Sequence, residues 1–163
     1  MKHTTRLPVI YGGPTVAGQG ELDNARRMFE LIRDHPDQGR KQMVLHPLLA
    51  ACAYNKCALQ AQDGWTGHVD PEGYGPNHWV RRYGYGLPDY YPNGRANQIE
   101  SLAHHGDGTP EQTFEGWLNS PGHRIHVLGL DPFYAGQTVC GVGYYRGGEK
   151  EHYWCFLSAP SEE

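Results

Sequence analysis

Residues 117–124 read Trp-Leu-Asn-Ser-Pro-Gly-His-Arg, and they place a histidine just after a helix should end. Upstream, Thr109 is a suitable N-cap, and the apolar spacing that follows predicts a helix over 110–119. Pro121 interrupts this helix because it has no backbone N–H to donate, and the glycine after it permits a sharp turn. We therefore expect His123 on open, bent backbone, where its imidazole either belongs to a site or interacts with the helix C-terminus.

Other helical and strand patterns frame this segment. The expected helices span 21–33, 47–62 and, more briefly, 77–83, whereas the strands of an expected hairpin span 139–145 and 152–157. The short segment 98–103 fits neither pattern clearly, and it carries Glu100 among apolar neighbours. Residues 1–19, rich in glycine and proline, are expected to form an extended arm, and residues 20–160 a single domain.

The amino-acid composition of the chain disfavours some classes of function. The chain has 163 residues, of which 38% are hydrophobic and 20% charged, and this suits one well-filled domain. Its formal net charge is −4 and its basic residues form no long block, so a nucleic acid or an anionic membrane is a disfavoured partner. No stretch has the length and apolar character of a membrane-spanning helix, so no integral membrane segment is expected. The first ten residues lack the continuous apolar region of a signal peptide.

The four cysteines leave one pairing open. Cys52 and Cys57 lie on different faces of one predicted helix, so they should not bond to each other. If residues 146–149 form the hairpin loop, Cys140 and Cys155 lie opposite one another on the two strands. That spacing suits either a disulfide or two reduced, buried thiols.

Five segments, taken in order, resemble the SCP domain of the CAP superfamily, in its bacterial branch. They are the helix that begins His-Pro-Leu at 46–48, Gly-His-Val-Asp-Pro-Glu-Gly at 67–73, Glu-Ser-Leu-Ala at 100–103, the segment 117–124, and Cys-Gly-Val-Gly-Tyr at 140–144. The resemblance covers nearly all of residues 21–158. It implies an α+β fold, a three-layer α-β-α sandwich with a mainly antiparallel central sheet.

The same resemblance implies a central cleft that gathers two histidines and acidic residues. It assigns His68, Glu100 and His123 to this cleft, and it places Ser120 where many members have a second glutamate. Two imidazoles and a carboxylate suit zinc or another divalent cation, with Glu100 either as a ligand or as the partner of a histidine's other ring nitrogen. The missing glutamate predicts a weaker ion site. A polar cleft that only braces the fold is the alternative.

Three functions follow from this site. The favoured one is a binding module for a divalent metal, a small apolar ligand such as a lipid, or a surface ligand. The second is a metal-dependent hydrolase with Glu100 as general base, which the absent His-Glu-x-x-His motif disfavours. The third is a structural component that attaches to a protein partner through residues 1–19. We therefore expect binding rather than catalysis.

Two further expectations concern surroundings and location. Aromatic loop residues are candidates for an apolar groove, although packing explains most of them; they are Trp65, Trp79, Tyr85, Tyr90 and Tyr91. His104, His105 and His126 are assigned no role. The resemblance suggests an extracellular protein, and the sequence itself leaves the compartment open.

Overall fold

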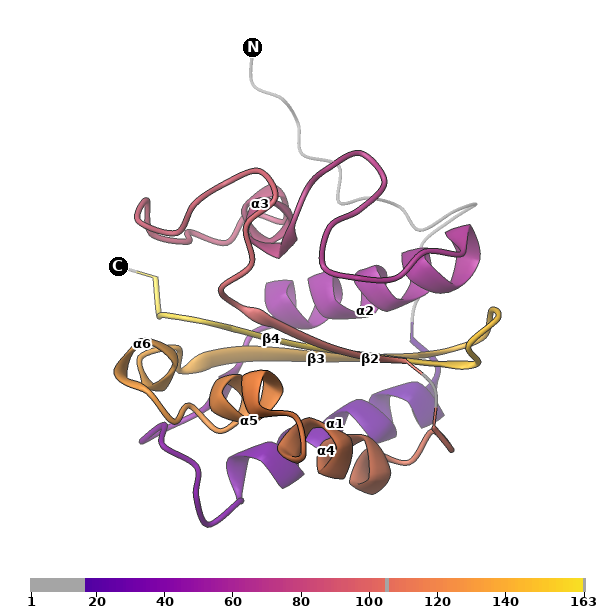
Figure 1. Ribbon diagram of the computed structural model, residues 1–163, viewed down its shortest axis with the longest axis horizontal. Coiled ribbons are helices and arrows are strands. Elements are labelled where there is room, and N and C mark those ends of the chain that lie inside the picture. The colour runs from indigo at the N-terminus through magenta and orange to yellow at the C-terminus, as the bar shows by residue number, and fades with distance from the viewer. Residues whose placement is uncertain (1–16, 105, 163) are drawn as a thin grey trace.

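The computed structural model describes residues 17–104 and 106–162, and these form three layers with a sheet in the middle (Figure 1). The elements, in chain order, are α1 (Gln19–Arg33), β1 (Val44–Leu45), α2 (Pro47–Asp63), α3 (Pro76–Arg82), β2 (Glu100–His104), α4 (Pro110–Leu118), α5 (Pro121–Val127), α6 (Pro132–Ala135), β3 (Val139–Arg146) and β4 (His152–Ala159). Helices α2 and α3 cover one face of the sheet, and α1, α4 and α5 cover the other (Figure 1). The expected α-β-α sandwich is confirmed.

The sheet has the strand order β1-β3-β4-β2 and is mixed. Strands β2, β4 and β3 pair antiparallel, whereas the two-residue β1 pairs parallel to β3 at one edge. The expectation of a mainly antiparallel sheet therefore holds for three of the four strands. The ambiguous segment around Glu100 becomes strand β2, because pairing with β4 supplies the partners that its short pattern could not specify.

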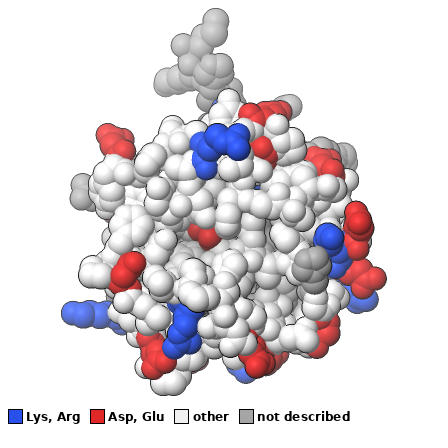
Figure 2. Space-filling view, in the orientation of Figure 1, with Lys and Arg blue, Asp and Glu red and all other residues white. Residues whose placement is uncertain are grey.

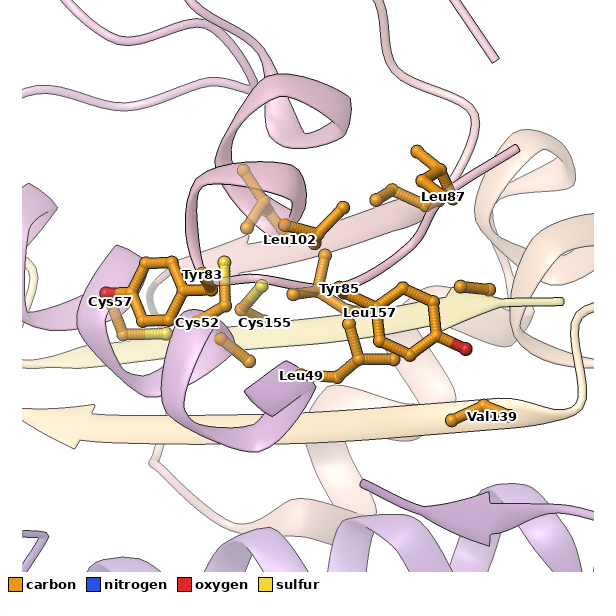
Figure 3. Close-up of a cluster of buried hydrophobic side chains, with 14 of the residues drawn as sticks. Leu49, Cys52, Cys57, Tyr83, Tyr85, Leu87, Leu102, Val139, Cys155 and Leu157 are labelled. Carbon is orange, nitrogen blue, oxygen red and sulfur yellow. The ribbon is translucent and has the colours of Figure 1, made fainter. Parts of the chain in front are cut away.

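Each face of the sheet buries its own apolar cluster. The cluster under α2 contains Leu49, Cys52, Cys57, Cys155 and Leu157, among others (Figure 3). The cluster on the opposite face contains Met28, Ile32, Trp117, Trp154 and Phe156, among others. Of the aromatic residues considered for a groove, Tyr85 and Tyr91 are buried in the first cluster, and Tyr90 is exposed.

Helix α2 lies directly against the backbone of β3. A Cβ atom at Gly141 would lie 2.2 Å from the carbonyl carbon of Leu49, and one at Gly143 would lie 2.4 Å from that of Ala53. Real Cβ atoms do not approach backbone so closely, so glycine is required at both positions. This close approach fixes the distance between α2 and the sheet.

The segment around Pro121 differs from its expectation in one respect. Helix α4 begins after the Thr109 cap, whose Oγ1 accepts a hydrogen bond from the backbone N–H of Gln112 at 3.3 Å, and it ends at Leu118 as expected. The expectation of bent backbone at His123 is wrong, because Pro121 opens a second helix, α5, with Ser120 at its N-cap. Proline is favoured at this first helical position, since the missing N–H would have no intrahelical partner there.

The N-terminal expectations are only partly covered by the structure. Helix α1 begins at Gln19, two residues before the predicted start at Glu21. The arm expected over residues 1–19 falls largely on residues 1–16, which lie outside the described part of the chain, as do the first ten residues considered for a signal peptide.

The expected register of the C-terminal hairpin is wrong, and of the two alternatives left open for Cys140 and Cys155 the structure has reduced, buried thiols. Cys140 pairs with Ser158 and Cys155 with Gly143, because the turn spans 147–151 instead of 146–149. Cys140 belongs to the cluster under α1 and α4, whereas Cys155 belongs to the cluster under α2, so the two thiols lie on opposite faces of the sheet. All four cysteines are free, which agrees with the expectation that Cys52 and Cys57 do not bond to each other.

Surface charge is spread thinly over the described residues. In the view of Figure 2, charged side chains lie mainly around the margin, and the middle of the face is mostly uncharged. No helix within residues 17–104 and 106–162 has the length and apolar character needed to cross a bilayer.

Candidate functional site

A cleft of about 220 Å³ lies where β2 begins, beside α5 and the loop between α2 and α3. Four residues singled out from the sequence line it together: His68, Glu100, Ser120 and His123. The other lining residues are Asn97, Gln98, Ile99, Ser101, Gly122, His126 and Tyr134. Segments that are distant in the sequence thus converge on one polar cleft.

Glu100 is the buried centre of this arrangement. Its side chain is 2% exposed, and its Oε1 atom lies 2.9 Å from His68 Nδ1 and 3.3 Å from the Lys56 ammonium. The Cys155 thiol lies 3.6 Å from the second carboxylate oxygen. Burial raises the pKa of Glu100, but the Lys56 charge and the His68 hydrogen bond outweigh it, and the pKa lies below its usual range. Glu100 is therefore ionised at neutral pH.

The carboxylate fixes the proton on His68. An ionised carboxylate can only accept a hydrogen bond, so His68 Nδ1 carries the hydrogen, and Nε2 keeps its lone pair when the ring is neutral. The backbone at His68 is also held in place, because the Lys56 ammonium donates a hydrogen bond to the His68 carbonyl at 2.7 Å. Lys56 thus holds both the histidine and its carboxylate partner.

His123 occupies the opposite wall, on α5. Its Nδ1 atom lies 2.9 Å from the Ser120 hydroxyl, so each of the two cleft histidines is oriented through its Nδ1 atom. Burial, together with the nearby His68, lowers the pKa of His123. His123 is therefore neutral at pH 7 and has a nitrogen lone pair available.

Glu100 does not fit the role of a direct metal ligand. Within the described residues, no group of three or more His, Cys, Asp or Glu side chains is placed to hold an ion. The reason lies in the partners of Glu100, because its carboxylate already accepts from His68, Lys56 and Cys155. His68, Glu100 and His123 are thus not grouped as ligands of one ion within the described residues, and Glu100 has the other expected position, as the hydrogen-bond partner of His68.

A second polar network lies deeper, around His126. The His126 ring is buried between Ser101 Oγ, 2.6 Å from Nδ1, and Ser158 Oγ, 2.8 Å from Nε2. Ser158 donates its hydroxyl hydrogen to the side-chain oxygen Oε1 of Gln137 at 2.6 Å, so His126 Nε2 must donate to Ser158. Nδ1 then accepts the hydrogen of Ser101. The expectation that His126 has no role is wrong, because it joins β2, β4 and α5.

This Ser101–His126 pair resembles the start of a nucleophilic dyad, but its electrostatics oppose that role. Burial, then the positive charge of Arg40, lowers the pKa of His126 well below its usual value. Ser158 contacts the ring nitrogen to which a catalytic triad presents a carboxylate, and Arg40 Nη2 donates to Ser158 Oγ at 3.3 Å. An imidazole that resists protonation is a poor general base, so the network is structural.

The lowered pKa of His126 predicts acid sensitivity. The folded state holds this ring neutral while the unfolded chain protonates near pH 6.5, so the unfolded state binds more protons below that pH. The free energy of unfolding should therefore fall as the pH drops below about 6.5, with a contribution of up to about 1.4 kcal/mol per pH unit from this proton. Urea unfolding at pH 7.5, 6.5 and 5.5 measures the slope.

The matched variant for that measurement is His126→Gln, which removes the titrating ring. It should be less stable at pH 7.5, and its stability should decline less steeply with falling pH. A slope equal to that of the unsubstituted protein would show that other groups cause the acid sensitivity.

Sequence reasoning missed Lys56, Ser101 and the inward position of His126. One signal for Lys56 was present, because it follows Cys52 by four residues and so shares its face of the predicted helix. A lysine at such a position needs a buried anion as partner. His126 follows His123 by three residues, which is neighbouring spacing only once 121–127 is recognised as a helix.

Comparison with solved structures identifies the fold. An outer surface protein from Borrelia burgdorferi superposes with a TM-score of 0.66 at 14% sequence identity, over 86% of this chain and 94% of that chain. An extracellular protein containing an SCP domain, from Bacillus anthracis str. Ames, superposes with a TM-score of 0.64 at 18% identity. That alignment covers 88% of this chain and 44% of the Bacillus chain.

Comparison of the amino-acid sequence alone finds no match. No protein-family profile matches the chain, and no curated protein sequence matches it. The likeness is therefore one of overall three-dimensional structure, at TM-scores of 0.66 and 0.64. On this ground, the described residues adopt a fold similar to that of the SCP-domain protein.

Proposed function

We propose that the protein is a binding module whose cleft takes a divalent cation, through His68 and His123, together with a small polar ligand. The observation that carries this proposal is the hydrogen bond of 2.9 Å between Glu100 and His68 Nδ1, in a cleft that His123 also lines. A carboxylate behind a histidine orients the ring and raises the basicity of its other nitrogen, as in many metal sites.

The chemistry of the donors favours a particular kind of ion. Neutral imidazole nitrogens suit zinc and neighbouring transition metals better than calcium or magnesium, which prefer oxygen ligands. With only two protein donors, an ion would be held weakly, and water or a bound ligand would complete its coordination. The ion would act as a Lewis acid that attracts a negatively charged or carbonyl oxygen of that ligand.

The cleft lining favours a polar ligand over a lipid. Asn97, Gln98 and Ser120 add amide and hydroxyl groups to the two histidines. These groups would lose hydrogen bonds with water if an apolar chain covered them, at a cost of about 1–3 kcal/mol for each unsatisfied group. A small molecule with several oxygens satisfies both the imidazoles and these side chains.

Nothing in the geometry favours hydrolysis with Glu100 as general base. A general base works best with a pKa near the operating pH, whereas the pKa of Glu100 is lowered because Lys56 and His68 stabilise its charge against the effect of burial. Binding is therefore the function that these residues support.

The location proposed for this module is the cell surface or the exterior. Its support is that the two solved structures are described as an outer surface protein and an extracellular protein. Labelling of intact cells with a membrane-impermeant amine reagent tests it, because the exposed lysine Lys41 would be modified only on an exterior protein. Protection from the reagent until the cells are lysed would contradict the proposed location.

The metal proposal predicts zinc binding that depends on both histidines. His68→Ala and His123→Ala should each weaken zinc binding at least tenfold, since each removes one of two protein donors. Ser120→Ala should weaken it less, because Ser120 only orients His123. Isothermal titration calorimetry with zinc chloride at pH 7.5 measures these affinities.

The control for these variants is His78→Ala, which removes an imidazole outside the cleft that stacks on Tyr74. It should leave zinc binding unchanged. Absence of heat with zinc for the unsubstituted protein, or equal loss of binding in the control, would overturn the proposal of a two-histidine site.

A further inference from the structure

A second hollow, of about 240 Å³, lies on the side of the molecule covered by α2 and α3. It shares no lining residue with the cleft at His68 and His123. Two indoles, two aliphatic side chains and three carboxylates line it. The lining residues are Leu59, Asp63, Trp65, Asp70, Pro71, Glu72 and Trp79. We name this surface the indole hollow.

The indole hollow is held in shape by hydrogen bonds. Trp79 Nε1 donates to one Asp70 oxygen at 2.7 Å, and the other Asp70 oxygen accepts from the backbone N–H groups of Glu72 and Tyr74 at 2.9 and 3.0 Å. The Trp65 ring lies over the Lys56 ammonium, which is 5.3 Å from its centroid. Both rings are thus positioned before any ligand arrives, which lowers the entropic cost of binding.

The charge of the indole hollow is of one sign. Three of its lining residues are acidic, and none is Lys, Arg or His. Across residues 17–104 and 106–162, no basic side chain forms a salt bridge with Asp70 or Glu72. Glu72 is exposed at the rim, whereas Trp65 and Trp79 are half-buried. Acidic side chains and two positioned indoles therefore line the same hollow.

This combination matches one class of ligand. The face of an indole carries negative electrostatic potential and attracts organic cations. A small metal ion would gain little from the apolar ring faces, and a neutral apolar molecule would gain nothing from the carboxylates. We propose that the indole hollow binds a quaternary ammonium group, with Trp65 and Trp79 against its methyl groups and Glu72 as counter-charge. This site goes beyond the proposed function of the cleft.

Nitrogen-15 NMR of the labelled protein tests the proposal with choline chloride as probe. The four indole N–H signals provide their own control, because Trp117 and Trp154 are buried in the cluster on the other face of the sheet. Choline should shift the signals of Trp65 and Trp79 in a saturable manner and leave the other two in place. The neutral isostere 3,3-dimethylbutan-1-ol should leave all four in place, since it has the same shape without the charge.

Two variants identify the groups responsible. Glu72→Gln removes one exposed charge and should weaken choline binding about threefold, as expected for a partly solvated ion pair. Trp65→Leu removes an aromatic wall and should weaken it about tenfold. Glu115→Gln, an exposed carboxylate on α4 beyond the opposite face of the sheet, is the matched control and should leave the affinity unchanged.

Three results would overturn this site. They are the absence of saturable shifts with choline, equal shifts with the neutral isostere, and an affinity that neither Glu72→Gln nor Trp65→Leu alters. Shifts of the two indole signals with glucose but not with choline would identify a carbohydrate surface and reject the cation.

Discussion

Lys56→Met is expected to lower the free energy of unfolding by about 3–5 kcal/mol at pH 7, the cost of leaving one member of a buried ion pair without its partner. Both side chains are almost completely buried, at 7% and 2% exposure for Lys56 and Glu100. The variant would also lose the hydrogen bond from the Lys56 ammonium to the His68 carbonyl. Urea unfolding followed by tryptophan fluorescence measures the loss.

Two further variants show whether the loss of stability comes from the buried ion pair. Lys41→Met replaces an exposed lysine and should change stability by less than about 0.5 kcal/mol. The double variant Lys56→Met/Glu100→Leu removes both charges, and it should recover part of the loss because no uncompensated anion remains. If the double variant were as unstable as the sum of the two single variants, the pair would not act as a unit.

The pH dependence of the same variant has a definite sign. The pKa of Glu100 is lowered in the folded protein, so the stability due to its ionised form is present above the ordinary pKa of 4.5. That contribution is lost as the pH falls from there through the lowered pKa. Removing Lys56 should move the loss to higher pH, because burial then acts on Glu100 with less opposition.

Gly143→Ala is expected to lower the free energy of unfolding by about 3 kcal/mol, at the upper end of the usual cost of overpacking a core. The added methyl group would lie 2.4 Å from both the Ala53 carbonyl carbon and the Tyr54 nitrogen. These are backbone atoms of α2, so no side chain can rotate to relieve the contact. The helix would have to move away from β3 along its length. Urea unfolding again provides the measurement.

A matched substitution separates this steric effect from the general effect of changing glycine to alanine. A Cβ at Gly116, in the exposed part of α4, would meet no atom within 4 Å. Gly116→Ala should stabilise the protein by about 0.8–1 kcal/mol, because alanine is the better helix former. Equal effects at positions 143 and 116 would show that α2 does not rest on the β3 backbone.

The layered fold could be predicted from the sequence where local pattern and tertiary context agree. The helix at α4 was correctly placed because the Thr109 cap and the apolar spacing point to the same boundaries. The hairpin register was not, because a turn with positive φ at Gly147, Gly148 and Glu151 is not specified by its two adjacent glycines alone. The two-residue β1 exists only through its pairing with β3, and so it has no local pattern.

Some residues of the candidate site could be predicted from the sequence, and others could not. His68, Glu100, Ser120 and His123 were found through short motifs in order, and the structure brings all four to one cleft. Lys56 was not found, because its place on the buried face of the predicted helix does not identify its partner, which lies 44 residues further along the chain. The role of His126 depends on α5, which was mistaken for a turn at Pro121.

Strand β2 carries Glu100 and Ser101 side by side, and each meets a polar partner on a different face of the sheet. Glu100 contacts Lys56 on α2, and Ser101 contacts His126 on α5. Because neighbouring side chains on a strand point to opposite faces, a slip of one residue would exchange them. The carboxylate would then face His126 and Arg40, and Lys56 would lose its anion. The two networks therefore specify the register of β2, because a shifted strand would lose its polar contacts on both faces of the sheet.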